Sequence, residues 1–120
     1  MILVDTSIWV DHLRRGNRAL AEALEAGLVV SHPFVIGELA CGTIRRRAEV
    51  LSLLARLDAM PVVATAEALR LVEERRLMGR GIGWIDVHLL ASSLLARVQL
   101  WSLDRRLASI ARDLGVAFVT

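Results

Sequence analysis

The chain has 120 residues, of which 55% are hydrophobic and only 4% are aromatic, and its formal net charge is +2. A chain of this length predicts a single domain covering residues 1–120. All 15 basic residues are arginine, which excludes a catalytic lysine, a P-loop lysine and a Schiff base. The only cysteine, Cys41, cannot form an internal disulfide, and no run of about eighteen apolar residues is free of charge. We therefore expect a cytoplasmic protein without a membrane span.

Short apolar runs alternate along the chain with longer segments of helical pattern. In chain order, the sequence predicts a strand at 2–4, helices at 6–14 and 18–26, a strand at 28–30, helices at 34–41 and 45–57, a strand at 61–63, helices at 65–78 and 84–97, a strand at 100–103, a helix at 105–114 and a strand at 116–119. The unalternating apolar runs are typical of strands buried on both faces of a parallel sheet. The order predicts a three-layer α/β/α fold, with helices on both faces of a central parallel sheet of about five strands.

Four acidic residues interrupt these apolar stretches. Asp5 and Asp104 end two predicted strands, while Glu38 and Asp86 lie early in predicted helices. Because ligands of open parallel sheets bind outside the carboxyl ends of the strands, all four side chains can face one edge. Taken singly, Asp5 and Asp104 are equally explained as helix N-caps, and Asp86 as a complement to the helix dipole. Glu38 has no such explanation, since none of its helical neighbours is a cation.

A metal ion accounts for four carboxylates in one place. Two charges about 5 Å apart at an effective dielectric of about 20 cost roughly 3 kcal/mol, and a divalent cation offsets this repulsion. Oxygen ligands favour Mg²⁺ or Mn²⁺ over zinc, and no histidine pair has ligand spacing on the same face as the acids. Hydroxyl groups beside Asp5 and Asp104 can orient a carboxylate, hold a water or cap a helix; they belong to Thr6, Ser7 and Ser102.

The other residues of chemical interest have structural interpretations. Cys41 is expected to be a small core residue, and the tryptophans are expected to be core anchors; these are Trp9, Trp84 and Trp101. The histidines are expected to be structural or exposed, namely His12, His32 and His88. The glycine-rich segment 79–83 follows a predicted helix and lacks the spacing of a phosphate loop, so we interpret it as a mobile loop.

These features together resemble the PIN-domain family, and most closely its VapC-type toxins of bacterial toxin–antitoxin pairs. The resemblance runs essentially from end to end. It rests on Val4-Asp5-Thr6-Ser7, Gly37-Glu38-Leu39, Gly83-Trp84-Ile85-Asp86-Val87-His88-Leu89-Leu90 and Leu100-Trp101-Ser102-Leu103-Asp104-Arg105-Arg106-Leu107. No acidic position of the family pattern is missing, and Ser102 stands where threonine is frequent.

The resemblance implies a PIN fold and an endoribonuclease that depends on Mg²⁺ or Mn²⁺. It implies that the catalytic and metal-binding residues are Asp5, Glu38, Asp86 and Asp104. Asp104 is the one most suited to act through a water or on a second metal. The metal acidifies a water and polarises the scissile phosphate, so that hydroxide attacks in line. The resemblance also implies a cognate VapB-like antitoxin that inhibits the site, and commonly a homodimer.

Arginine side chains are candidates for contacts with RNA phosphates, which make binding strongly dependent on salt. The candidates are Arg45, Arg46, Arg47, Arg80 and Arg105. A solvated helix face explains residues 45–47 as well, and an ion pair near Asp104 explains Arg105 equally.

Two other functions remain open from the sequence. A non-catalytic PIN-like binding module would keep the acidic pocket without activity, and only a cleavage assay separates it from an enzyme. A receiver-type regulatory domain also gathers acids around Mg²⁺, but it needs a lysine and two adjacent acids after the first strand, and this chain has neither. The apolar surplus is consistent with a groove for an amphipathic antitoxin helix over residues 18–26 and 34–57.

Overall fold

The computed structural model describes residues 1–120 and contains three strands and seven helices. The strands are β1 (Ile2–Val4), β2 (Val29–Val30) and β3 (Gln99–Trp101). The helices are α1 (Thr6–Arg15), α2 (Arg18–Glu25), α3 (Pro33–Cys41), α4 (Arg47–Arg56), α5 (Thr65–Arg75), α6 (Trp84–Ala96) and α7 (Arg105–Asp113). The seven predicted helices are confirmed, with ends that differ from the prediction by up to three residues.

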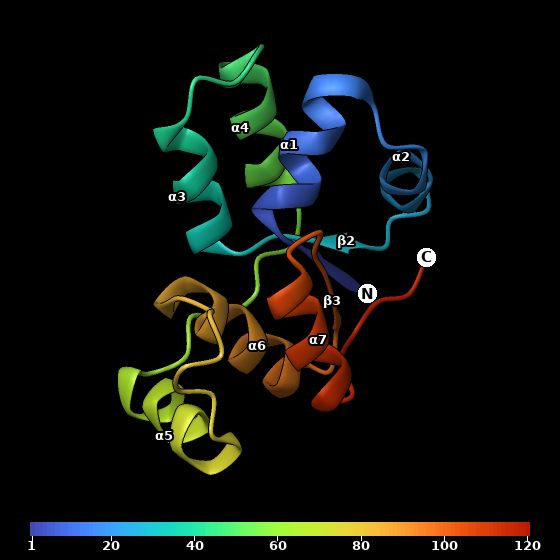
Figure 1. Cartoon of the computed structure of the whole chain (residues 1–120). Coiled ribbons are helices and arrows are strands. Elements are labelled where there is room, and N and C mark those ends of the chain that lie inside the picture. Colours follow the sequence, from blue (N-terminus) through green and yellow to red (C-terminus); the bar gives the residue numbers. More distant parts are fainter.

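β1 is the middle strand of a parallel sheet with the order β2-β1-β3. Ile2 pairs with Val29 on one side, and Leu3 pairs with Leu100 on the other. The chain leaves β1 toward β2 and later returns to its opposite side at β3, so the winding direction reverses at β1. Figure 1 shows the result, with α1 to α4 in one half of the molecule, α5 to α7 in the other and the strands between them. A reversal of this kind opens a crevice at the carboxyl end of the middle strand.

The prediction of about five strands is wrong, because the predicted strand at 61–63 forms no pair and the one at 116–119 contributes a single residue pair. Ser31 pairs with Ala59 beyond β2, and Leu100 pairs with Ala117 beyond β3. At the first edge Pro61 has no N–H to continue a ladder, and its carbonyl accepts a side-chain hydrogen bond instead. At the other edge the last pairing donor is Phe118, after which the chain runs into solvent. The chain around Ala59 and around Ala117 therefore runs beside the sheet for one residue pair and then turns away from it.

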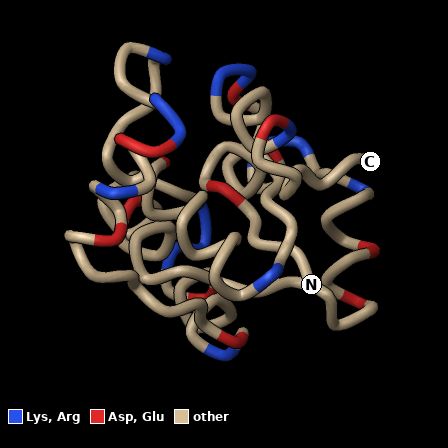
Figure 2. Tube along the Cα trace, turned by 90° about the horizontal axis from the view of Figure 1, so that it is seen from below, with Lys and Arg blue, Asp and Glu red and all other residues tan.

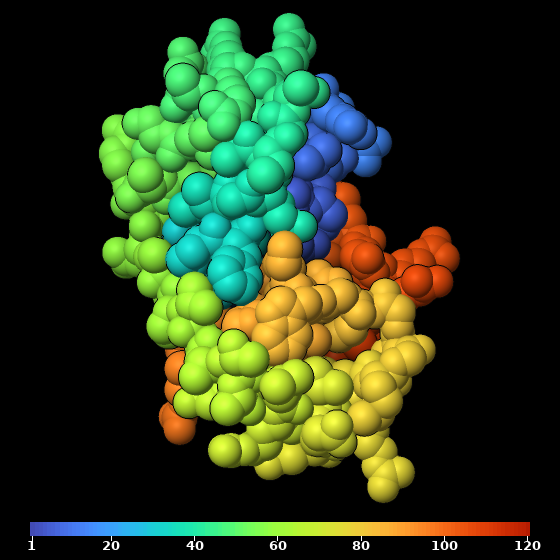
Figure 3. All heavy atoms as spheres, turned by 90° about the vertical axis from the view of Figure 1, so that its left-hand side faces the viewer, coloured from blue at the N-terminus to red at the C-terminus, as the bar shows by residue number.

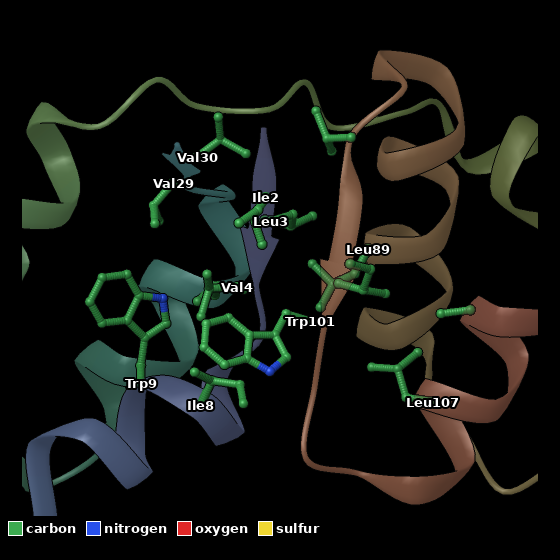
Figure 4. Close-up of a cluster of buried hydrophobic side chains, with 14 of the residues drawn as sticks. Ile2, Leu3, Val4, Ile8, Trp9, Val29, Val30, Leu89, Trp101 and Leu107 are labelled. Atoms are coloured by element: carbon green, nitrogen blue, oxygen red, sulfur yellow. The ribbon is translucent and has the colours of Figure 1, made fainter. Parts of the chain in front are cut away.

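The core packs around the middle strand. In Figure 4, Ile8 and Trp9 of α1 lie near Val4, while Leu89 of α6 and Leu107 of α7 lie across β3 from them. All five side chains are at most 1% exposed and belong to one cluster of 23 buried residues. The two helix layers therefore close on a common core, which fixes the ends of β1 and β3 relative to α1 and α6.

Arginines in the left-handed conformation set three helix boundaries. Arg46 precedes α4 with φ 51°, Arg76 follows α5 with φ 52°, and Arg97 follows α6 with φ 56°. Because a left-handed residue does not continue a right-handed helix, α4 begins two residues later than predicted and α5 ends three residues earlier. None of the helices is both long and apolar enough to cross a membrane.

Candidate active site

Asp5 follows the middle strand and is 7% exposed. Its backbone N–H donates to the Trp101 carbonyl at 2.9 Å, which ties the ends of β1 and β3 together. Its Oδ1 accepts the N–H of Thr6 at 2.8 Å and so caps α1. Its Oδ2 accepts two hydroxyl hydrogen bonds, from Ser7 at 2.9 Å and from Ser102 at 2.6 Å. Both oxygens are thus engaged, and the carboxylate is held in one orientation.

The same two hydroxyls also hold the chain that follows β3. Ser7 Oγ accepts the N–H of Leu103 at 3.0 Å, and Ser102 Oγ accepts the N–H of Asp104 at 3.0 Å. Each hydroxyl therefore donates to Asp5 and accepts from the backbone next to Asp104. Through this network the position of Asp104 depends directly on that of Asp5.

Glu38 is exposed on α3, whose buried side is formed by Val35 and Leu39. Its Oε1 accepts the hydroxyl hydrogen bond of Thr6 at 2.7 Å, and its Oε2 makes no hydrogen bond. The hydrogen-bond partner of Glu38, which the sequence does not reveal, is thus the neutral hydroxyl of Thr6 at the start of α1. This bond brings Glu38 next to the residue that follows Asp5.

Asp86 lies in the first turn of α6, where its Oδ2 accepts the N–H of Gly83 at 3.2 Å. Burial raises the pKa of Asp86 above its usual 3.8, and the Gly83 hydrogen bond opposes this rise. The charges of Asp5, Asp104 and Glu38 raise the pKa of Asp86 further. Like charges act on a pKa in this way only when they are close, so the four carboxylates share one electrostatic environment.

Asp104 is exposed and caps α7. Its Oδ1 accepts the N–H groups of Arg106 at 2.9 Å and Leu107 at 3.2 Å. Asp5 and Asp104 are therefore N-caps, as the simpler explanation of each requires. Capping uses only one oxygen of Asp104, and Oδ2 makes no hydrogen bond.

Four segments far apart in the sequence meet in this region. Figure 3 shows the blue start of the chain, the teal α3, the orange α6 and the red-orange segment near α7 next to one another on one face. The apolar sequence context suggests buried acids, yet Glu38 and Asp104 are exposed. The buried neighbours of Glu38, Val35 and Leu39, lie on another side of α3, and Asp104 follows β3 in an exposed turn with Leu103.

The oxygen-only donor set suits a hard divalent cation. One carboxylate oxygen is free of hydrogen bonds on each of Glu38, Asp86 and Asp104. No three acidic, histidine or cysteine side chains are arranged to hold one ion by themselves. Small hard cations keep several waters and bind through one or two carboxylates, so the residues present fit a hydrated ion.

The arginines divide into engaged and free groups. Arg47 donates two hydrogen bonds to the Ala40 carbonyl, at 3.1 and 2.9 Å, and Arg80 pairs with Asp113 at 3.0 Å. Of the five candidate arginines, three are exposed and make neither an ion pair nor a side-chain hydrogen bond, namely Arg45, Arg46 and Arg105. Arg45 and Arg46 line a cavity of about 580 Å³ between α1 and α4, away from the carboxylates. Figure 2 shows basic positions interspersed with acidic ones around the chain, without a single basic face.

Two residues expected in the core lie beside the acids instead. Trp84 is 43% exposed and Cys41 is exposed, whereas Trp9 and Trp101 are buried as predicted. Cys41 lies two residues beyond the buried Leu39, about 200° around α3, which turns it away from the core. Trp84 and Cys41 line one cavity with Glu38. The exposure of Trp84 could have been inferred from its position as the first residue of the predicted helix, where a side chain is only partly covered by neighbours.

Comparison with known families decides the identity of this fold. The family model described as PIN domain matches residues 2–113. The chain belongs to the PIN-domain family. This PIN domain is 49% identical over 118 residues to Ribonuclease VapC32 of two Mycobacterium tuberculosis strains, CDC 1551 / Oshkosh and ATCC 25618 / H37Rv. The alignment covers 98% of this chain and 95% of each relative, which confirms the predicted VapC-type membership.

A solved structure also resembles this PIN domain in fold. PAE2754 from Pyrobaculum aerophilum superposes with a TM-score of 0.60 over 90% of this chain and 77% of that chain. The two sequences are 16% identical, so the likeness concerns the fold alone.

Proposed function

We propose that this PIN domain is the toxin of a toxin–antitoxin pair and cleaves RNA as a divalent-metal-dependent endoribonuclease. Its 49% identity to Ribonuclease VapC32 along nearly the whole chain supports the activity. We assign the catalytic and metal-binding roles to Asp5, Glu38, Asp86 and Asp104. Oxygen-only donors favour Mg²⁺ or Mn²⁺ as the metal.

The observation that carries the assignment is the gathering of four carboxylates from four elements around Asp86. Burial is the main cause that raises the pKa of Asp86, and the charges of the other three carboxylates raise it further. Carboxylates that are close together and have no basic partner repel one another, and this repulsion destabilises the folded protein. A bound cation removes the repulsion. The two ion pairs of the chain involve none of these four residues.

When bound, the divalent cation supplies Lewis acidity, which lowers the pKa of a water and offsets charge on the scissile phosphate. The protein holds the ligands. Ser7 and Ser102 fix Asp5, Thr6 restrains Glu38, and the Gly83 N–H positions Asp86. Because these partners are neutral, they orient the carboxylates without neutralising the charge that attracts the metal.

Exposed arginines supply the positive charge that an RNA backbone needs. Arg105 adjoins Asp104 and makes no ion pair, so it is the best placed of the five candidates to meet a phosphate near the site. Arg45 and Arg46 are free but lie just before α4, away from the carboxylates, while Arg47 and Arg80 are engaged within the protein. We therefore assign phosphate contacts to Arg105 first and to Arg45 and Arg46 second.

We further propose that residues 1–120 form one PIN domain that acts in the cytoplasm, binds a VapB-like antitoxin and forms a homodimer. The relatives named VapC support an antitoxin partner. The PIN-domain match removes the receiver-type alternative, whereas a non-catalytic binding module is separated from an enzyme only by assay.

The test is cleavage of RNA by the purified protein with Mg²⁺ or Mn²⁺. We expect EDTA to abolish cleavage and Mn²⁺ to restore it, and we expect Asp5→Asn and Asp86→Asn to reduce it to near background. Asn keeps the size and the capping oxygen of each side chain, and replaces the other carboxylate oxygen and the charge by a neutral NH₂ group. The matched control is Asp58→Asn, since Asp58 is exposed and makes no side-chain hydrogen bond. Near-wild-type cleavage by both site variants, with folding intact by circular dichroism, would sink the assignment.

A further inference from the structure

An apolar cavity of about 590 Å³ lies directly beside the carboxylates, between α3 and α6. Its main lining residues are Phe34, Glu38, Cys41, Trp84 and Ile85. Glu38 therefore belongs to the cavity and to the acidic group at once. Figure 3 shows α3 and the beginning of α6 in contact on this face. Anything bound at the carboxylates is thus adjacent to the cavity.

Trp84 is held rigidly at this cavity. Its ring packs edge to face against the ring of His88, one turn later in α6. The ring centroids are 4.7 Å apart and the interplanar angle is 86°. His88 in turn meets Phe34 of α3 at 4.9 Å, and Phe34 meets His32 at 5.2 Å. His88 and His32 are buried, so this row of four rings links the partly exposed Trp84 to the core. The 43% of Trp84 that stays exposed is a preformed aromatic surface.

The charge of the cavity lining identifies its occupant. No arginine lines the cavity, and its one charged residue is Glu38, so it does not suit a phosphate. A flat, uncharged ring suits an aromatic wall of this kind, and proteins read single-stranded RNA mainly by stacking bases on such walls. In an RNA whose backbone passes the carboxylates, the base next to the cleaved phosphate is the uncharged ring within reach.

We propose that this cavity binds a base of the RNA substrate next to the cleaved bond, with Trp84 as the stacking surface. The proposal rests on the ribonuclease function proposed above and adds a subsite to it. Trp84 is a binding residue here and takes no part in the chemistry. The subsite makes cleavage depend on an unpaired base at one position relative to the cleaved bond.

Kinetics of substitutions at Trp84 test the subsite. Removal of one stacking ring by alanine weakens binding of a base by about 5- to 150-fold, so we expect Trp84→Ala to lower kcat/KM for RNA within that range. Trp84→Phe keeps a ring and is expected to recover most of the loss. Leu95→Ala serves as the matched control, because Leu95 is a 61% exposed apolar residue of the same helix outside this cavity. Equal kcat/KM for Trp84→Ala and the wild type would overturn the proposal.

Substrates with a missing base separate stacking from a structural effect. In a series of oligoribonucleotides, one position at a time on either side of the cleaved bond carries an abasic ribose. We expect one position at which the wild-type protein cleaves the abasic RNA as slowly as Trp84→Ala cleaves the intact RNA. If no position reproduces the loss, the cavity does not read a base.

Fluorescence gives a readout that does not need cleavage. Trp9 and Trp101 are 1% and 6% exposed, so Trp84 is the tryptophan that a bound base can quench. With EDTA present, single-stranded RNA is expected to quench the wild-type protein saturably and Trp84→Phe much less. If RNA quenches the fluorescence but no metal supports cleavage, the proposed ribonuclease function is refuted and the base-binding cavity is retained. If RNA is cleaved but does not quench the fluorescence, the ribonuclease function is retained and the base-binding cavity is refuted. A Trp84→Ala variant that loses only antitoxin binding would assign the cavity to the antitoxin and end the proposal.

Discussion

Neutral hydroxyl groups hold two of the four carboxylates of this site, those of Asp5 and Glu38. Thr6 Oγ1 donates to Glu38, while Ser7 and Ser102 donate to the same oxygen of Asp5. A hydrogen bond to a carboxylate narrows its rotamers and leaves its charge in place. The loss of one hydroxyl should therefore affect the chemistry more than the fold.

Thr6→Val tests this at Glu38, because valine has the shape of threonine without the hydroxyl. We expect roughly a tenfold lower kcat/KM for RNA, since a hydrogen bond to a charged group is lost. The free energy of unfolding should change by no more than about 0.5 kcal/mol, because the bond is exposed. Thr6→Ser restores the donor and should restore cleavage. A Thr6→Ser variant as slow as Thr6→Val would show that the methyl group, and not the hydrogen bond, matters.

The placement of the four candidate acids in one region could be predicted from the sequence, but their hydrogen-bond partners could not. An acid at the end of an apolar run, such as Asp5 or Asp104, is visible because strand ends meet at one sheet edge. The hydroxyl of Ser102 reaches Asp5 across 97 residues, and only the pairing of β3 with β1 creates that contact. Trp84 was misassigned because a large apolar side chain is usually buried, and its one-turn contact with His88 is invisible to composition.

At the scale of elements, a buried histidine fixes the start of α3, the helix that carries Glu38. His32 Nδ1 accepts the N–H of Phe34 at 3.0 Å, so Nε2 carries the proton and lies 3.1 Å from Ser92 Oγ. Ser92 in turn donates to the Pro61 carbonyl at 2.8 Å. The neutral imidazole is thus fully satisfied, and protonation would break the bond that caps the helix.

This cap predicts a loss of stability on acidification. Burial, and then the neighbouring His88, lower the pKa of His32 from its usual 6.5 to about 4. Between pH 6.5 and pH 4, His32 is therefore protonated in the unfolded chain but neutral in the folded chain. The contribution of His32 to the free energy of unfolding is complete above pH 6.5 and decreases as the pH falls toward 4. The full shift corresponds to on the order of 3 kcal/mol.

Urea unfolding at several pH values measures the effect. His32→Asn keeps an oxygen that can cap α3 and removes the titrating ring. The variant should show a flatter dependence of unfolding free energy on pH than the wild type, whatever its absolute stability. Parallel curves for the two proteins would contradict the role of His32.

Element prediction succeeded for helices and failed at the sheet edges for a physical reason. A helix satisfies its own hydrogen bonds, so its apolar pattern and end signals are local. A strand exists only where a neighbour pairs with it; the segment 61–63 finds none, and the segment 116–119 finds one at a single residue. Val63 and Val116 are buried as the apolar pattern predicts, whereas Val62 and Val119 are exposed, and burial of single residues does not require a ladder.

At the scale of the whole molecule, the acidic group opposes the stability of the metal-free fold. Asp86 is partly buried and repelled by three other carboxylates. Asp86→Asn removes this repulsion and retains an oxygen for the Gly83 N–H. In EDTA, we expect the Tm of Asp86→Asn to exceed that of the wild type by about 2–5 °C. Mn²⁺ should raise the Tm of the wild type and raise that of the variant much less.

Differential scanning fluorimetry measures both shifts, with Asp58→Asn as the control for loss of one surface charge. An Asp86→Asn variant that gains as many degrees with Mn²⁺ as the wild type would place the metal elsewhere. A variant that is less stable in EDTA than the wild type would contradict the repulsion.

The middle strand is made first, and the strand that completes the site is made last. β1 ends at Val4, while its partner β3 and the hydroxyl that fixes Asp5 lie beyond residue 98. A nascent chain therefore contains Asp5, Glu38 and Asp86 before it contains β3, whose pairing with β1 brings Ser102 to Asp5. The order of synthesis thus places the acids in the chain before the strand whose pairing orders them.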